Sequence, residues 1–74
     1  MNANEVVEAV RAGRSLEGVT LQQVVLSGQK LDGVKLKGAK LYGVNLDGAS
    51  LRGADLTEAT LFGCSMIGVD LSAA

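Results

Sequence analysis

The side chains in this chain that could do covalent chemistry are one cysteine and a set of hydroxyls. A thiol or hydroxyl becomes a nucleophile when a nearby base removes its proton, and histidine most often does this at neutral pH. The chain has no histidine, and its single cysteine is Cys64. Cys64 stands at a repeat position that is alanine elsewhere, as at Ala39 and Ala54, so we interpret it as a space-filling core residue. The sequence predicts no catalytic residue.

Phosphate binding and metal binding are not indicated either. Glycines return every five residues with a leucine between them, so the GxGxxG and GxxxxGK[ST] templates for phosphate loops are both unmet. The lone cysteine and the absence of histidine remove the commonest metal ligands. Enzymes also need a ligand cleft, which a packed repeat protein of this size does not readily supply. We therefore expect no cofactor, no metal ion and no small-molecule substrate.

The charge balance and the hydropathy pattern limit the classes of partner. Seven Lys plus Arg residues and eight Asp plus Glu residues give a net charge of −1, which disfavours a nucleic-acid partner. The cations gather in the middle of the chain and the acids towards its end: Lys30, Lys35, Lys37, Lys40 and Arg52 against Asp55, Glu58 and Asp70. No apolar stretch approaches the roughly 20 residues that span a bilayer. We expect a cytoplasmic protein that does not bind membranes.

Leucine recurs at every fifth position from Leu16 to Leu71, with Met66 in one of these places. On a helix of about 3.6 residues per turn, this spacing would scatter the leucines around the axis. On a long strand, it would send alternate leucines to opposite faces. The period therefore predicts a solenoid, a chain wound into stacked coils.

Each five-residue unit has the order small apolar, polar, leucine, polar, glycine, as in 34–38 and 39–43. Three residues alternate inward, outward and inward, and the last two make a corner where glycine permits a turn. Two corners carry Gln23 and Glu58 instead, and we expect a negative φ there. The hydroxyls Ser15, Thr20, Ser50, Thr60 and Ser65 fall on outward positions. The predicted structural core includes Leu36, Leu41, Leu46, Leu51, Leu56, Leu61, Met66 and Cys64.

This repeat resembles that of the pentapeptide-repeat family, whose consensus is close to Ala-Asp/Asn-Leu-x-x. The segment Ala-Asp-Leu-Thr at 54–57 matches it directly. The resemblance covers about 14–73 and implies an all-β solenoid, namely a right-handed quadrilateral β-helix with four pentapeptides per coil. About three coils would follow, at 14–33, 34–53 and 54–73.

The segment 2–12 is predicted to be a short helix that caps the first coil. Asn2 and Glu5 are spaced as in a capping box. One helix face would carry three valines: Val6, Val7 and Val10. Such a lid would cover apolar side chains and an open strand edge. The expected division is a capping helix at 1–13 and a pentapeptide-repeat β-helix at 14–74.

The last coil lacks an equivalent lid, because only three small residues follow Leu71. We expect a protein partner or a second copy to cover that end, as in family members that dimerise there, or the chain to be part of something longer. A 20-residue coil would also stack Tyr42 beneath Phe62, either as a protein contact or as a stabilising aromatic pair. It would set Lys35 beside Asp55 as a weak surface ion pair.

These features favour a non-catalytic structural or protein-interaction module of bacterial pentapeptide-repeat type. One alternative comes from family members that imitate duplex DNA, bind DNA gyrase and protect it from fluoroquinolones. A second alternative is a domain of a larger bacterial, secretion-associated protein, because the segment 5–16 resembles the helix that opens such domains. The sequence identifies no partner and leaves a possible homodimer open.

Overall fold

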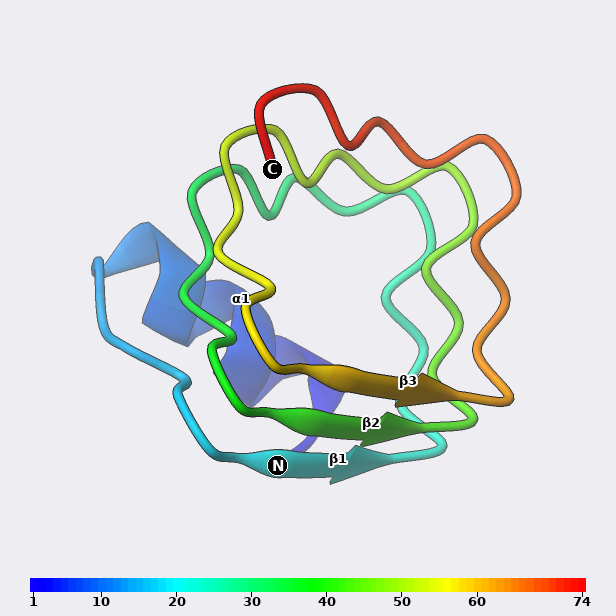
Figure 1. Cartoon of the computed structure of the whole chain (residues 1–74), viewed down its shortest axis with the longest axis horizontal. Coiled ribbons are helices and arrows are strands. Elements are labelled where there is room, and N and C mark those ends of the chain that lie inside the picture. The colour runs from blue at the N-terminus through cyan, green and yellow to red at the C-terminus, as the bar shows by residue number, and fades with distance from the viewer.

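The computed structural model describes all 74 residues and shows a chain wound around a central axis, with one helix beside its first part (Figure 1). Helix α1 spans Ala3–Arg11. The strands are short: β1 at Thr20–Gln22, β2 at Lys40–Tyr42 and β3 at Thr60–Phe62. They form a parallel sheet in the order β1-β2-β3. Each strand has three residues because the chain turns a corner before more can extend.

Parallel pairing places each residue beside the residue 20 positions later in the chain. Tyr42 pairs with Gln22 on one side and with Phe62 on the other, which confirms the predicted stacking of the two aromatic residues. Single parallel bridges repeat this register at other points around the coil: Val25 with Asn45, Lys30 with Ser50, and Lys35 with Asp55. Hydrogen bonds along the axis therefore hold successive coils in one fixed register.

The leucines of the repeat form the interior. Those from the first part of the chain are all buried: Leu16, Leu21, Leu26, Leu31, Leu36, Leu41, Leu46 and Leu51. The small residues between them, such as Ala39 and Val44, are fully enclosed. No polar or charged residue is buried, so the core is held by apolar contact alone.

The last part of the chain is much less enclosed than the sequence led us to expect. Leu56, Cys64 and Met66 are only half-buried, and Leu61 is 39% exposed. Leu61 is therefore not a buried core residue of the single chain. The reason is geometric, because each inward side chain is covered from both sides only when a coil follows it along the axis.

Helix α1 agrees closely with the predicted segment. Asn2 is its N-cap, the reciprocal capping box with Glu5 is formed, and Ala12 is the C-cap. Val6 and Ala9 are the buried residues of the helix, whereas Val7 and Val10 are half-buried. All three valines of the predicted stripe therefore contact the core, Val6 as a buried member and Val7 and Val10 packed against it. No helix has the length and apolarity that a membrane crossing requires.

The prediction for the two corners without glycine was wrong. Gln23 has φ 57° and Glu58 has φ 58°, close to the +67° of a corner glycine such as Gly48. Each corner must align with the equivalent corner of the next coil, and only one turn geometry keeps the coils stacked. These two residues therefore adopt a conformation that side chains disfavour.

Candidate interaction site

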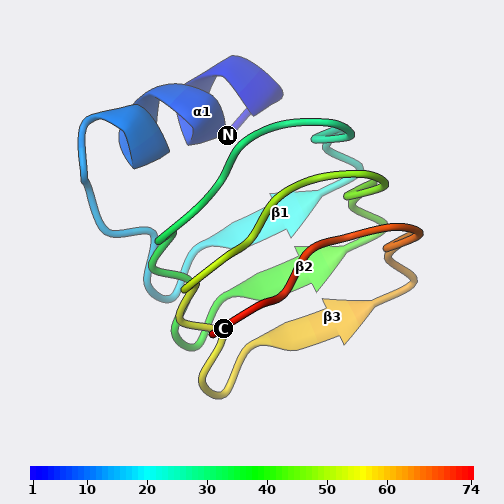
Figure 2. The same ribbon diagram turned by 90° about the horizontal axis from the view of Figure 1, so that it is seen from above.

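The last part of the chain, from β3 onwards, carries exposed apolar residues, and we call this surface the C-terminal edge. Its members are Leu61, Phe62, Ile67 and Leu71, with exposed fractions of 39%, 72%, 76% and 43%. Figure 2 shows α1 at the β1 end of the sheet and β3 at the opposite end. Monomeric proteins rarely leave several large apolar residues together in water, so this edge is a candidate contact surface.

Backbone groups along the C-terminal edge also lack partners. The N–H of Leu46 donates to the carbonyl of Ser65 at 2.8 Å, and the N–H of Leu51 donates to the carbonyl of Asp70 at 2.8 Å. The equivalent N–H groups one coil later, on Met66 and Leu71, donate to no backbone carbonyl. The edge therefore offers unused donors together with apolar side chains, which is a template for pairing with another chain.

The two aromatic residues differ in environment. Tyr42 is half-buried in β2, between Gln22 and Phe62 on its neighbouring strands. Phe62 is 72% exposed because no strand follows β3. Phe62 therefore belongs to the C-terminal edge, whereas Tyr42 has neighbours on both sides.

Two aspartates join neighbouring coils through side-chain hydrogen bonds that sequence reasoning missed. Oδ1 of Asp47 accepts from Oγ of Ser65 at 2.5 Å and from the N–H of Ile67 at 2.8 Å. Asp32 accepts in the same way from Ser50 Oγ and from the N–H of Arg52. The only signal in the sequence is a serine 18 positions after each aspartate.

These hydrogen bonds favour the ionised form of both carboxylates. The Ser65 hydroxyl, and then the Ile67 N–H, lower the pKa of Asp47. The Ser50 hydroxyl, followed by the Arg52 N–H, lowers the pKa of Asp32. Both aspartates link coils rather than present a reactive acid, so they support structure and not catalysis.

The predicted ion pair across Lys35 and Asp55 does not form, although the two residues pair in register. Asp55 instead accepts from the N–H of Thr57 at 3.0 Å. The ion pair that joins two coils is Arg52 with Asp70, at 4.0 Å. Local turn geometry thus decides where the Asp55 carboxylate points, because a carboxylate readily accepts from an N–H two residues later.

Cys64 is half-buried, with its Sγ 3.4 Å from the carbonyl oxygen of Leu41. The thiol therefore contacts β2 rather than a base. No group of histidine, cysteine, aspartate and glutamate side chains is arranged to hold a metal ion.

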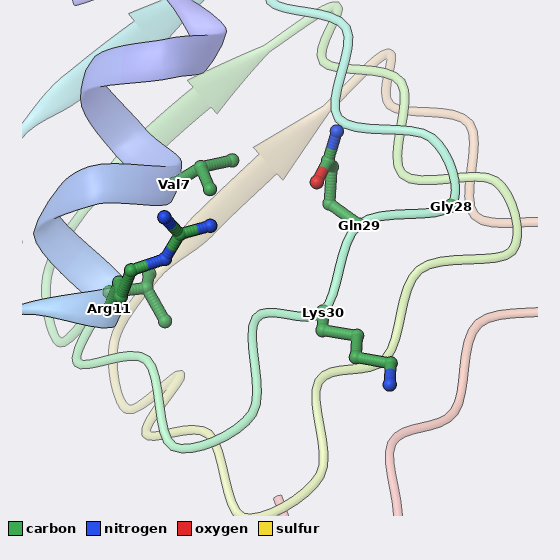
Figure 3. Close-up of a pocket in the computed structure, with 6 residues that line it drawn as sticks. Val7, Arg11, Gly28, Gln29 and Lys30 are labelled. Carbon is green, nitrogen blue, oxygen red and sulfur yellow. The ribbon is translucent and has the colours of Figure 1, made fainter.

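A groove of about 420 Å³ lies between α1 and the segment 28–30 (Figure 3). We call it the α1 groove, and its lining residues are Val7, Val10, Arg11, Gly28, Gln29 and Lys30. Sequence reasoning missed this site. By the five-residue repeat Gln29 falls at an inward position, which is Ala49 one coil later. Gln29 is instead exposed at the groove, because a polar amide is costly to bury without hydrogen bonds.

The comparison with known families agrees with this geometry. A family model described as pentapeptide repeats matches the chain at residues 15–48 and 39–74, with 8 copies. The chain belongs to the pentapeptide-repeat family. Its repeats imply a β-helix, in keeping with the 20-residue register and the parallel sheet. Members of this family are generally structural or interaction modules. No curated protein matches the sequence.

Proposed function

We propose that this pentapeptide-repeat chain is a non-catalytic protein-interaction module of the bacterial cytoplasm, and that a second copy of the chain covers its C-terminal edge. The solenoid itself is proposed to be a right-handed quadrilateral β-helix of about three coils. The observation that carries the proposal is the combination of exposed apolar side chains and unused backbone donors at that edge.

A second copy suits this edge because the surface is self-complementary. Leu71 and Phe62 are apolar on both copies, and N–H and C=O groups alternate along the same backbone. A two-fold arrangement would bring identical edges together and would leave neither C-terminal edge free. Burial of the exposed leucines and of Ile67 would supply the driving force.

The charge pattern favours this proposal over imitation of DNA. A protein that competes with duplex DNA needs acidic groups along its outer faces. Here Lys35, Lys37 and Lys40 follow one another on the middle part of the chain, and the net charge is only −1. Gyrase binding and a secretion-associated role therefore stay as secondary proposals, because we find no surface on this chain that favours either of them.

The test is the mass of the 74-residue chain by light scattering over a concentration series. We expect a discrete dimer, and we expect Leu71→Glu to convert it to a monomer, because a buried charge without a partner opposes association. Val25→Glu is the matched control. Val25 is 60% exposed, and its β-bridge to Asn45 places it at the other end of the solenoid. It should leave the dimer intact.

Two results would overturn the proposal. One is a monomer at every concentration with a folded circular dichroism spectrum. The other is a dimer that survives Leu71→Glu but is lost with Val25→Glu, which would place the interface elsewhere.

A further inference from the structure

The α1 groove lies at the opposite end of the solenoid from the C-terminal edge and combines an apolar wall with polar groups. Val7 and Val10, both half-buried, come from one side of the helix. Figure 3 shows the Arg11 guanidinium and the Gln29 side chain on facing sides of the opening, with the Lys30 ammonium directed away. The groove thus has hydrogen-bond donors at its mouth and valines beside them.

Gln29 departs from the repeat at this place. By register it corresponds to Ala49, which is 1% exposed, and to Val69, which is half-buried. The repeat needs a small apolar side chain at that position, yet Gln29 places an exposed amide at the groove. A glutamine contributes nothing to the core here, so its amide is free to bind a ligand.

The backbone beside Gln29 presents a second unused group. The N–H of Ser50 donates to the carbonyl of Gln29 at 3.0 Å, and the N–H of Leu31 donates to the carbonyl of Ser50 at 2.8 Å. The groups on both sides of Lys30 therefore point to the next coil, so the N–H and C=O of Lys30 point away from that coil. Neither takes part in a backbone hydrogen bond.

The charge at the groove is positive and weakly compensated. Arg11 pairs with Glu8 at 3.4 Å, but the two side chains are 73% and 64% exposed. Such a pair contributes little, and a guanidinium has five N–H donors, so Arg11 can bind a further acceptor. None of the lining residues is acidic.

We propose that the α1 groove binds an extended acidic peptide segment of a partner protein. The segment would add as a short strand beside Lys30, using its free N–H and C=O. One carboxylate of the segment would accept hydrogen bonds from Arg11 and Gln29, and a neighbouring aliphatic side chain would pack on Val7 and Val10. Backbone pairing supplies affinity in this mode, and the side-chain contacts supply the preference for acid.

The test is an NMR titration of the 15N-labelled chain with a blocked peptide of sequence TVEVT, and with TVQVT as the neutral match. We expect TVEVT to shift the amide signals of 28–30 and to slow hydrogen exchange at Lys30. TVQVT should bind about five-fold more weakly, the ratio that about 1 kcal/mol of charge-assisted contact gives. Arg11→Gln should weaken TVEVT to the same degree.

Two further variants separate the groove from general charge effects. Glu8→Gln should tighten TVEVT binding, because it removes the competing carboxylate from Arg11. Lys40→Gln removes a cation from β2, outside the groove, and should leave the affinity unchanged. The proposal is overturned if millimolar TVEVT moves no signal in 28–30, or if Lys40→Gln weakens binding as much as Arg11→Gln.

Discussion

The same leucine position recurs on the three strands, at Leu21 in β1, Leu41 in β2 and Leu61 in β3. Replacing each leucine by alanine therefore compares the same side chain at different degrees of burial. Leu41 is 1% exposed, and Leu41→Ala should leave an enclosed cavity that costs about 3–4 kcal/mol. Leu61 is 39% exposed, so only about 60% of a full burial energy of roughly 2 kcal/mol is at stake. Leu61→Ala should therefore cost about 1 kcal/mol in the monomer.

The assay is urea unfolding followed by circular dichroism, with the free energy of unfolding obtained by linear extrapolation. A chain of this length has a stability of about 4–11 kcal/mol, so Leu41→Ala should remove a large part of that stability and lower the urea midpoint accordingly. The measurement is made at low micromolar protein and again at a much higher concentration. If two copies cover the C-terminal edge, the cost of Leu61→Ala should increase at the higher concentration.

Equal losses for Leu41→Ala and Leu61→Ala at low concentration would refute the burial difference. A loss for Leu61→Ala that stays the same at every concentration would instead refute coverage of the C-terminal edge by a second copy. Leu21→Ala serves as the control, because Leu21 is 1% exposed and lies nearer to α1. Its cost should resemble that of Leu41→Ala at both concentrations.

Three other predictions concern corners, carboxylates and the helix cap. Glu58→Gly should raise the free energy of unfolding by about 0.5–1 kcal/mol, because φ 58° is strained for a residue with a side chain. In the same urea assay, Gly48→Ala should lower the free energy of unfolding by about 1 kcal/mol. The pKa of Asp47 is lowered in the fold by the Ser65 hydroxyl, so its stabilisation is present above about pH 4 and is lost as pH falls further; urea midpoints at pH 7 and pH 3 should differ less in Asp47→Asn. Asn2→Ala should cost about 1 kcal/mol through loss of the capping box, measured by thermal unfolding.

Each of these has a result that would contradict it. Destabilisation by Glu58→Gly would show that the side chain makes a contact worth more than the backbone strain. An unchanged pH dependence in Asp47→Asn would mean that other carboxylates, such as Asp32, dominate acid unfolding. If Asn2→Ala lowers stability no more than Asn4→Ala, an exposed control within α1, the cap contributes nothing.

The features of the fold that could be predicted are those that depend on residues a few positions apart in the sequence. The five-residue period needs only the alternation of a brief strand and a corner, so it identified the inward leucines. The capping box of Asn2 and Glu5 depends on three residues of separation, and it formed as expected. The pairing of Tyr42 with Phe62 followed from 20 residues per coil, a number taken from the family resemblance.

The candidate sites could be predicted only in part. Leu71 was named as a contact residue from the missing lid and Phe62 from its predicted stacking on Tyr42, and both are exposed. The α1 groove was not found, because it requires knowing that α1 lies beside 28–30 and that Gln29 turns away from the core. Neither fact can be predicted from residues that are close together in the sequence.

The amino-acid sequence by itself determined the solenoid, its inward leucines and its N-terminal cap, because these follow from the period of the chain and from hydrogen bonds between near neighbours. Only the tertiary structure decided the positive φ of Gln23, the contact of Asp47 with Ser65, and the exposure of Leu61. Each of these depends on what stands one coil away. Corner geometry must align with the neighbouring corner, a carboxylate takes the nearest donors, and a leucine is buried only when another coil covers it.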